Sequence, residues 1–146
     1  MDTADIDLRN ATYGRFVALG RAPKAAEIAA AIERSESDVR DGWRRLHDAH
    51  ALVLDGSGEI RMANPFSAVP TAFRVEAAGK SWFANCAWDA FGIGAALRVD
   101  SLIDTDCADC HDPIRLAVRD GRPDDTDLVF HVLVPAISWW QDIGFT

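Results

Sequence analysis

The sequence predicts an α+β protein with two lobes, and three observations support this. The N-terminal part is rich in strong helix formers, and a hairpin pattern follows it. Beyond "NPFSAVPT", residues 64–71, short β-type runs surround one helix of small residues. We therefore expect a winged-helix-like lobe of three helices over residues 1–63. A small mixed β-sheet lobe with a short helix should follow over residues 64–146.

Three helices and a hairpin are expected in the first lobe. The first helix covers residues around Leu8 to Leu19, and Pro23 suits the start of the second, in "KAAEIAAAIERS". The third begins near Ser37, with Ser35 or Ser37 as its cap. After it, "ALVL" and "EIRM" flank "DGSG", which predicts a hairpin. One face of the third helix carries residues at helical spacing: Val39, Trp43, Leu46 and His50.

In the second lobe, the runs "AFRVEA" and "KSWFA" predict a hairpin through an Ala-Gly turn. "DAFGIGAAL" should be a short helix. "PIRLAV" and "DLVFHVLV" are expected to be strands, the second with His131 as a core histidine. "PAISWWQD" should start a helix, with Pro135 at its first turn.

The charge of the chain argues against nucleic acid and anionic membranes as partners. The 146 residues carry a formal net charge of −8, whereas both partners attract a basic surface. The winged-helix layout invites DNA binding through Arg40, Arg44 and Arg45. Acidic residues on the same helix, Asp38, Asp41 and Asp48, cancel that charge. With no membrane-length apolar run and an acidic start, we expect a cytoplasmic protein.

The stretch "FANCAWDAFGIG", residues 83–94, places Cys86 and Asp89 three positions apart where a strand gives way to a helix. Helix-terminal N–H groups and the helix dipole favour a thiolate there, so we expect a lowered pKa at Cys86. Asp89 then lies on nearly the same face, within reach of the thiol or of its ligand. The same spacing also fits a helix-capping Asp89 beside a simply buried Cys86.

Cys107 and Cys110 form a C-x-x-C followed by His111. Such a pair is half of a zinc site, but a second pair at suitable spacing is missing. Covalent haem attachment has no export signal to support it, and a thioredoxin-type pair would need a helix where Pro113 and a strand-like run follow. The aromatic residues Trp88 and Phe91 flank Cys86 and Asp89, and we expect them to line a substrate pocket.

The chain resembles the organomercurial (alkylmercury) lyase family. The resemblance rests on "PFSAVPTAFRVEAAGKSWFANCAWDA", on "DTDCADCHDPIRLAV" and on the winged-helix-like lobe. It implies protonolytic cleavage of carbon–mercury bonds to a hydrocarbon and Hg(II). In that family the cysteine matching Cys86 captures mercury, and the aspartate matching Asp89 delivers a proton to the carbon. Thiolate is the natural ligand of a soft metal, and a held carboxylic acid can protonate the carbon at short range.

The family pattern also has a second catalytic cysteine, expected just past the segment that "WWQDIGFT" resembles, whereas this chain ends at Thr146. Three readings follow: the second lobe is truncated, Cys110 or Cys107 replaces the absent thiol, or the relative does not cleave mercury. The expected metal ligands are Cys86, Asp89 and Cys110.

No cofactor should be required for that reaction. Bound Hg(II) would be the product, and small thiols would serve as exogenous reductant or acceptor. The alternative function is a non-catalytic thiol or soft-metal-binding module or sensor, or a relative that acts on another organometal.

Overall fold

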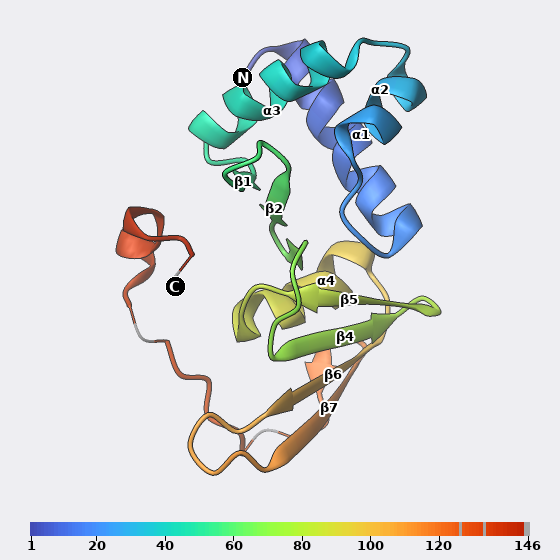
Figure 1. Ribbon diagram of the computed structural model, residues 1–146. Helices are drawn as coiled ribbons and strands as arrows, with labels where there is room; N and C mark the ends of the chain where they lie inside the picture. The colour runs from blue at the N-terminus through green and yellow to red at the C-terminus, as the bar shows by residue number, and fades with distance from the viewer. Residues whose placement is uncertain (126, 133, 145–146) are drawn as a thin grey trace.

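The computed structural model describes residues 1–125, 127–132 and 134–144, and it confirms the α+β class (Figure 1). No helix in these ranges is long and apolar enough to cross a membrane. The helices are α1 (Thr3–Leu19), α2 (Ala25–Ile32), α3 (Glu36–Asp48), α4 (Ala87–Leu97) and the 3-10 helix η1 (Ala136–Gln141). The strands are β1 (Val53–Leu54), β2 (Ile60–Ala63), β3 (Phe66–Ser67), β4 (Phe73–Ala77), β5 (Lys80–Ala84), β6 (Ser101–Asp106), β7 (Pro113–Arg119) and β8 (Arg122–Pro123).

The first lobe forms the three predicted helices and the hairpin β1–β2. Helix α3 begins after Ser35, whose Oγ accepts a hydrogen bond from the N–H of Asp38 at 3.1 Å. Its predicted apolar face is fully buried at Val39, Trp43 and Leu46. The prediction that His50 lies on this helical face is wrong. Helix α3 ends at Asp48, and His50 then takes a left-handed conformation and is exposed.

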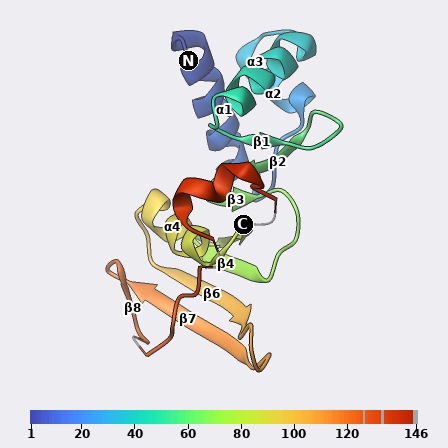
Figure 2. The ribbon, with the colours of Figure 1, turned by 90° about the vertical axis from the view of Figure 1, so that its left-hand side faces the viewer.

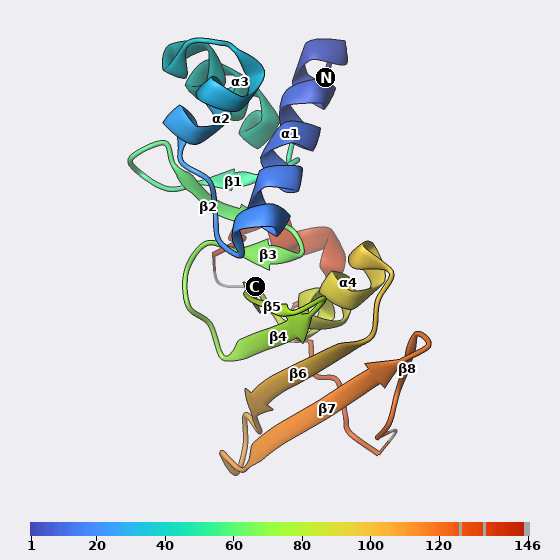
Figure 3. The same cartoon turned by 90° about the vertical axis from the view of Figure 1, so that its right-hand side faces the viewer.

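All described strand pairings are antiparallel, so the sheet is not the mixed one that the sequence predicted. Its order is β1-β2-β3-β5-β4-β6-β7-β8. The short strand β3 pairs with β2 on one side and β5 on the other, and so carries the sheet from the hairpin into the second lobe (Figure 3). The predicted lobe boundary at residue 64 therefore lies inside a continuous sheet, and the division into two domains stays a prediction.

The predicted hairpin of the second lobe is confirmed as β4–β5. Ala78 and Gly79 form its turn with φ values of 49° and 73°, as a tight two-residue turn requires. Strand β7 and helix α4 also lie where they were expected. Strands β3, β6 and β8 were not predicted from the sequence. Of these, β6 pairs with both β4 and β7 and is central to the sheet.

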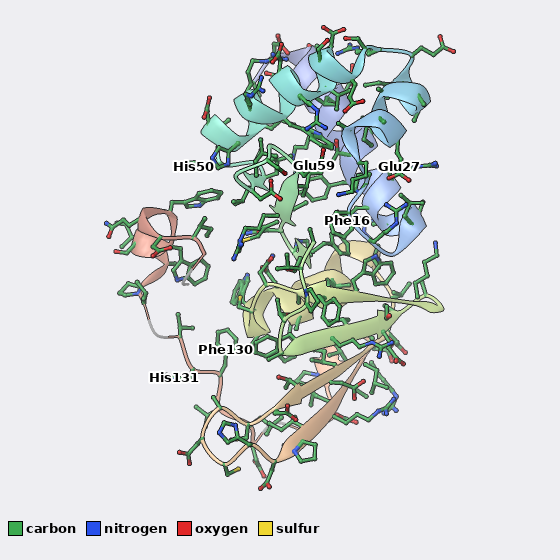
Figure 4. The ribbon with its side chains drawn as sticks, viewed as in Figure 1. Phe16, Glu27, His50, Glu59, Phe130 and His131 are labelled. Carbon is green, nitrogen blue, oxygen red and sulfur yellow. The ribbon has the colours of Figure 1, made fainter. Side chains whose placement is uncertain are left out.

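The run "DLVFHVLV" was wrongly predicted to be a strand. In its described residues, 127–132 and 134, the structure shows no strand, and His131 is exposed rather than part of the core (Figure 4). An apolar run becomes a strand only beside an edge that can pair with it, and no pairing forms here. The predicted helix after Pro135 is present as η1, a 3-10 helix.

The two lobes are joined by direct contacts as well as by the sheet. Trp82 of β5 donates its indole N–H to the carbonyl of Phe16 in α1 at 3.4 Å, and Lys80 Nζ lies 2.8 Å from the carbonyl of Ala18. Phe16 also stacks on Phe66 of β3, with ring centroids 5.2 Å apart. One hydrophobic core therefore runs from α1 to α4.

Helix α4 packs closely against β6 because Gly94 has no side chain. A Cβ at Gly94 would lie 2.5 Å from Ser101 Oγ and 3.0 Å from Ser101 Cβ. Gly14, on the exposed face of α1, has nothing within 4 Å of such a Cβ. These two glycines offer a matched test of the packing that positions α4.

We expect Gly94→Ala to lower the free energy of unfolding by about 1–3 kcal/mol, because the methyl group must push α4 away from β6. The control Gly14→Ala should raise it by about 0.5–1 kcal/mol through helix propensity. Urea unfolding followed by circular dichroism measures both. A Gly94→Ala protein as stable as Gly14→Ala would contradict this packing.

Candidate functional site

Cys86 and Asp89 lie at the junction of β5 and α4. Only Asn85 and Cys86 separate the last residue of β5 from the first residue of α4. Cys86 is the N-cap, in an extended conformation with φ −153° and ψ −178°, and its carbonyl accepts the N–H of Ala90 at 2.9 Å. Asp89 lies in the first helical turn and is 8% exposed. The predicted helix start at this pair is therefore confirmed.

The two residues line one small cavity of about 130 Å³. Its walls come from three parts of the chain: the end of β2, the β5–α4 junction and the C-terminal segment. The lining residues are Met62, Asn64, Asn85, Cys86, Asp89, Trp139, Ile143 and Gly144. Larger hollows lie elsewhere, such as one of about 510 Å³ between α2 and the β1–β2 hairpin, but it contains no cysteine or histidine. The small cavity is therefore the better candidate for thiol chemistry.

The C-terminal segment reaches this cavity from the far end of the chain. Figure 2 shows η1 in front of β3 and α4, and Figure 1 shows that it stands to one side of them. Trp140 stacks on His50, just after α3, with ring centroids 4.1 Å apart and an interplanar angle of 6° (Figure 4). The adjacent Trp139 donates its indole N–H to the carbonyl of Val134 at 2.7 Å. These contacts hold Trp139 where it forms one wall of the cavity.

The carboxyl group of Asp89 is buried next to an amide donor. Burial raises its pKa, and the hydrogen bond from Asn85 partly opposes that rise. Asn85 Nδ2 donates to Asp89 Oδ2 at 2.9 Å. The raised pKa favours the protonated acid, which is the form that can donate a proton to a bound ligand.

Asn85 links this carboxyl group to the connection between β2 and β3. Its Nδ2 also lies 3.3 Å from Asn64 Oδ1 and 3.3 Å from the carbonyl of Phe66. Its Oδ1 is buried and has no hydrogen-bond partner in the described part of the chain. Asn85 thus holds Asp89 in place and leaves a buried acceptor beside the cavity.

The expectation of a lowered pKa at Cys86 is wrong. Burial raises the pKa of this half-buried thiol, and the backbone N–H groups of Asp89 and Trp88 only partly oppose it. The negative charge of Asp89 raises the pKa further. The helix start supplies the expected favourable amides, but burial and a neighbouring acid outweigh them. The raised pKa therefore favours the thiol form of Cys86.

Several predicted site residues lie away from this cavity. Trp88 is 63% and Phe91 37% exposed, and neither lines it; Trp88 instead lies 6.4 Å from the ring of Phe130. Cys110 and Cys107 lie in the turn between β6 and β7 and do not line it either. In residues 1–125, 127–132 and 134–144, no group of three or more His, Cys, Asp or Glu could hold a metal ion.

Most of the cavity wall was not predicted from the sequence. Asn85 lies inside the quoted motif, and its position between strand and cysteine was the available signal. Met62 adds a thioether, a soft donor, and is 8% exposed. Tyr13 of α1 also lies within electrostatic reach: burial raises its pKa, Arg9 opposes that, and Asp89 adds to the rise. Neither Met62 nor Tyr13 carries a local sequence signal.

Comparison with known proteins identifies the family and the fold. The family model described as alkylmercury lyase matches residues 66–146. Among solved structures, the fold is similar to the mercury-bound form of MerB2, with a TM-score of 0.66 and 22% sequence identity. The match covers 86% of this chain and 60% of that one, so the chain spans about three fifths of the length of this relative. A search of curated proteins finds no match.

The burial of Asp89 predicts a characteristic dependence of stability on pH. Its pKa is raised in the folded state, so stability falls as pH rises from the unfolded value of about 3.9 through the folded pKa. Asp89→Asn cannot ionise and avoids this loss. We therefore expect its stability relative to the wild type to increase as pH rises through that window, as measured by urea unfolding at a series of pH values.

Asp5 provides a control of opposite sign. Its hydrogen bond from Arg45 lowers its pKa, so its contribution is present above the unfolded value and is lost as pH falls through the folded pKa. Asp5→Asn should be less stable than the wild type at neutral pH, and the difference should shrink in acid. If the relative stability of Asp89→Asn does not increase with pH, the buried-acid description of Asp89 is wrong.

Proposed function

The chain belongs to the alkylmercury lyase family, and on that premise we propose that it cleaves carbon–mercury bonds at the Cys86–Asp89 site. The observation that supports the proposal best is the shared cavity, which places a thiol and a buried carboxylic acid side by side. A thiol alone could capture mercury. Cleavage also needs a proton donor held at short range, and Asp89 meets that need.

Capture would come first. The Cys86 sulfur attacks an organomercurial R–Hg–X; the Hg–S bond forms, the Hg–X bond breaks, and the thiol proton leaves with X. Thiolate is a preferred ligand of a soft metal, so the exchange is favourable even though the resting thiol has a raised pKa. The Met62 thioether in the wall is a further soft donor.

Protonolysis would follow from Asp89. Its carboxyl proton moves to the metal-bound carbon, so that a C–H bond forms and the Hg–C bond breaks. Hg(II) is left between the Cys86 thiolate and the Asp89 carboxylate. Two small thiols then take Hg(II) away as a bis-thiolate and return one proton each to Cys86 and Asp89. No step is a redox step, so the small thiols act as acceptors of the metal and not as reductants.

The size of the cavity limits the organic group. About 130 Å³ admits a mercury atom with a short alkyl or a single aryl group and little more, unless Trp139 and its neighbours move. The alternative function, a non-catalytic soft-metal module, is favoured by one observation: Cys86 is the only thiol among the residues described as lining the cavity. Capture without cleavage is therefore the outcome that the experiment must distinguish.

The test is release of hydrocarbon from the purified chain. With phenylmercury and excess small thiol, benzene should form faster than in the thiol-only control, as measured by gas chromatography. Asp89→Ala should still bind one mercury per chain but release benzene about 10²–10⁴-fold more slowly, because the proton donor is lost. Cys86→Ser should lose both benzene release and the phenylmercury bound in the cavity.

Ser37→Ala is a suitable control, since this exposed residue in the first turn of α3 is remote from the cavity and should leave release unchanged. Stoichiometric mercury binding without benzene release would contradict the lyase proposal and favour the binding module. Normal release by Cys86→Ser would contradict both functions at this site.

A further inference from the structure

The turn between β6 and β7 contains a second pair of sulfur atoms that the Cys86–Asp89 site does not use. It spans residues 107–112 and joins the two longest strands, at the end of the molecule remote from the helical lobe (Figure 1). Cys107 is half-buried and Cys110 is exposed. Because Cys110 is open to solvent, a ligand can reach the pair without any movement of the cavity wall.

The backbone of this turn brings the two cysteines together. The N–H of Cys107 donates to the carbonyl of Asp112 at 2.9 Å, and the N–H of His111 donates to the carbonyl of Cys107 at 3.0 Å. His111 takes a left-handed conformation with φ 60°, which reverses the chain. The hydrogen bond between His111 and Cys107 closes a single turn of the chain that contains both cysteines.

The surroundings shift the pKa values of the two thiols in opposite directions. Backbone N–H groups of Cys110 and Asp109 lower the pKa of Cys107, and the Cys110 side chain lowers it further. For Cys110, the N–H of Asp112 favours the thiolate, but the Asp112 carboxylate and the Cys107 sulfur outweigh it and raise the pKa. The Cys110 thiol donates to Asp112 Oδ2 at 3.2 Å.

The surroundings favour a cation. Asp106, Asp109 and Asp112 are all exposed on or beside this turn, so its local charge is strongly negative. The ligand set, however, is small, since no cluster of three or more metal-binding side chains forms within the described ranges. Zinc, which takes four ligands in structural sites, is poorly served by two sulfurs. A soft cation that binds only two thiolate ligands suits this pair of cysteines.

We propose that Cys107 and Cys110 form a second soft-metal site that chelates a two-coordinate thiophilic cation such as Hg(II). On binding, two S–Hg bonds form and the two bonds from mercury to its incoming chloride or monothiolate ligands break; the cysteine thiol protons leave with those ligands or pass to water, and no electron is transferred. The site does not depend on carbon–mercury cleavage at Cys86. It gives the chain a solvent-exposed dithiol for inorganic mercury in addition to its enclosed single thiol.

The test uses the full chain with the cavity thiol removed. Cys86→Ala, reduced and then titrated with mercuric chloride against excess small monothiol, should retain one Hg(II) per chain, as measured by native mass spectrometry and by thiolate-to-mercury charge-transfer absorbance. Adding Cys110→Ser should weaken retention by about 100-fold or more, because one thiolate cannot chelate. Cys110 is exposed, so this variant should fold normally.

Two further variants complete the experiment. Cys86→Ala with Cys107→Ser should lose retention to the same degree, with circular dichroism confirming that the protein is folded. Cys86→Ala with His111→Ala should retain Hg(II) unchanged, because the imidazole is not one of the two ligands. Equal retention with and without Cys110 would overturn the proposal, and so would a comparable loss in the His111→Ala variant. Since every variant lacks Cys86, the result is independent of hydrocarbon release.

Discussion

The short connection between β5 and α4 is the constraint on which the candidate site depends. With only Asn85 and Cys86 between strand and helix, the chain must turn from extended to helical at the cysteine itself. That turn fixes Cys86 as the N-cap and sets Asp89 in the first helical turn, facing the same space. Asn85, held at the end of the strand, is then in reach of Asp89. The sheet behind β5 and the close contact of Gly94 with Ser101 keep this geometry rigid.

The electrostatics of the site follow from burial more than from helix position. A cysteine at a helix start in water would be expected to ionise readily, since the amides there face it. Here the same amides are present, yet burial raises the pKa values of both Cys86 and Asp89, and the negative charge of Asp89 raises the pKa of Cys86 further. Raised pKa values favour the neutral forms of both groups, which suits chemistry in which protons must be delivered to a ligand.

Local patterns were sufficient to predict the helices, both hairpins and the junction that carries Cys86 and Asp89. They failed where the structure depends on distant partners. Strand β6 was missed because "SLIDTD" is polar, and only its place between β4 and β7 makes it a strand. The apolar residues 127–132 favoured a strand, but they form none, because their backbone has no sheet edge with which to pair. Trp88 and Phe91 lie next to the site in sequence, but helical geometry turns them outward. Met62 and Trp139 come from far away along the chain, and no local signal could place them in the wall.

The stacking of Trp140 on His50 has a consequence for the order of folding. The stacking holds the C-terminal segment against the helical lobe. Trp139 then lines the same cavity as Met62 and Asn64, which are far from it in the sequence. Contacts of such high sequence separation form late, because the entropy of closing the intervening loop must be overcome first. On a ribosome, the thiol and the acid would emerge and fold against the sheet well before the tryptophan that encloses them. A nascent chain would therefore present Cys86 and Asp89 before Trp139 is available to close the cavity.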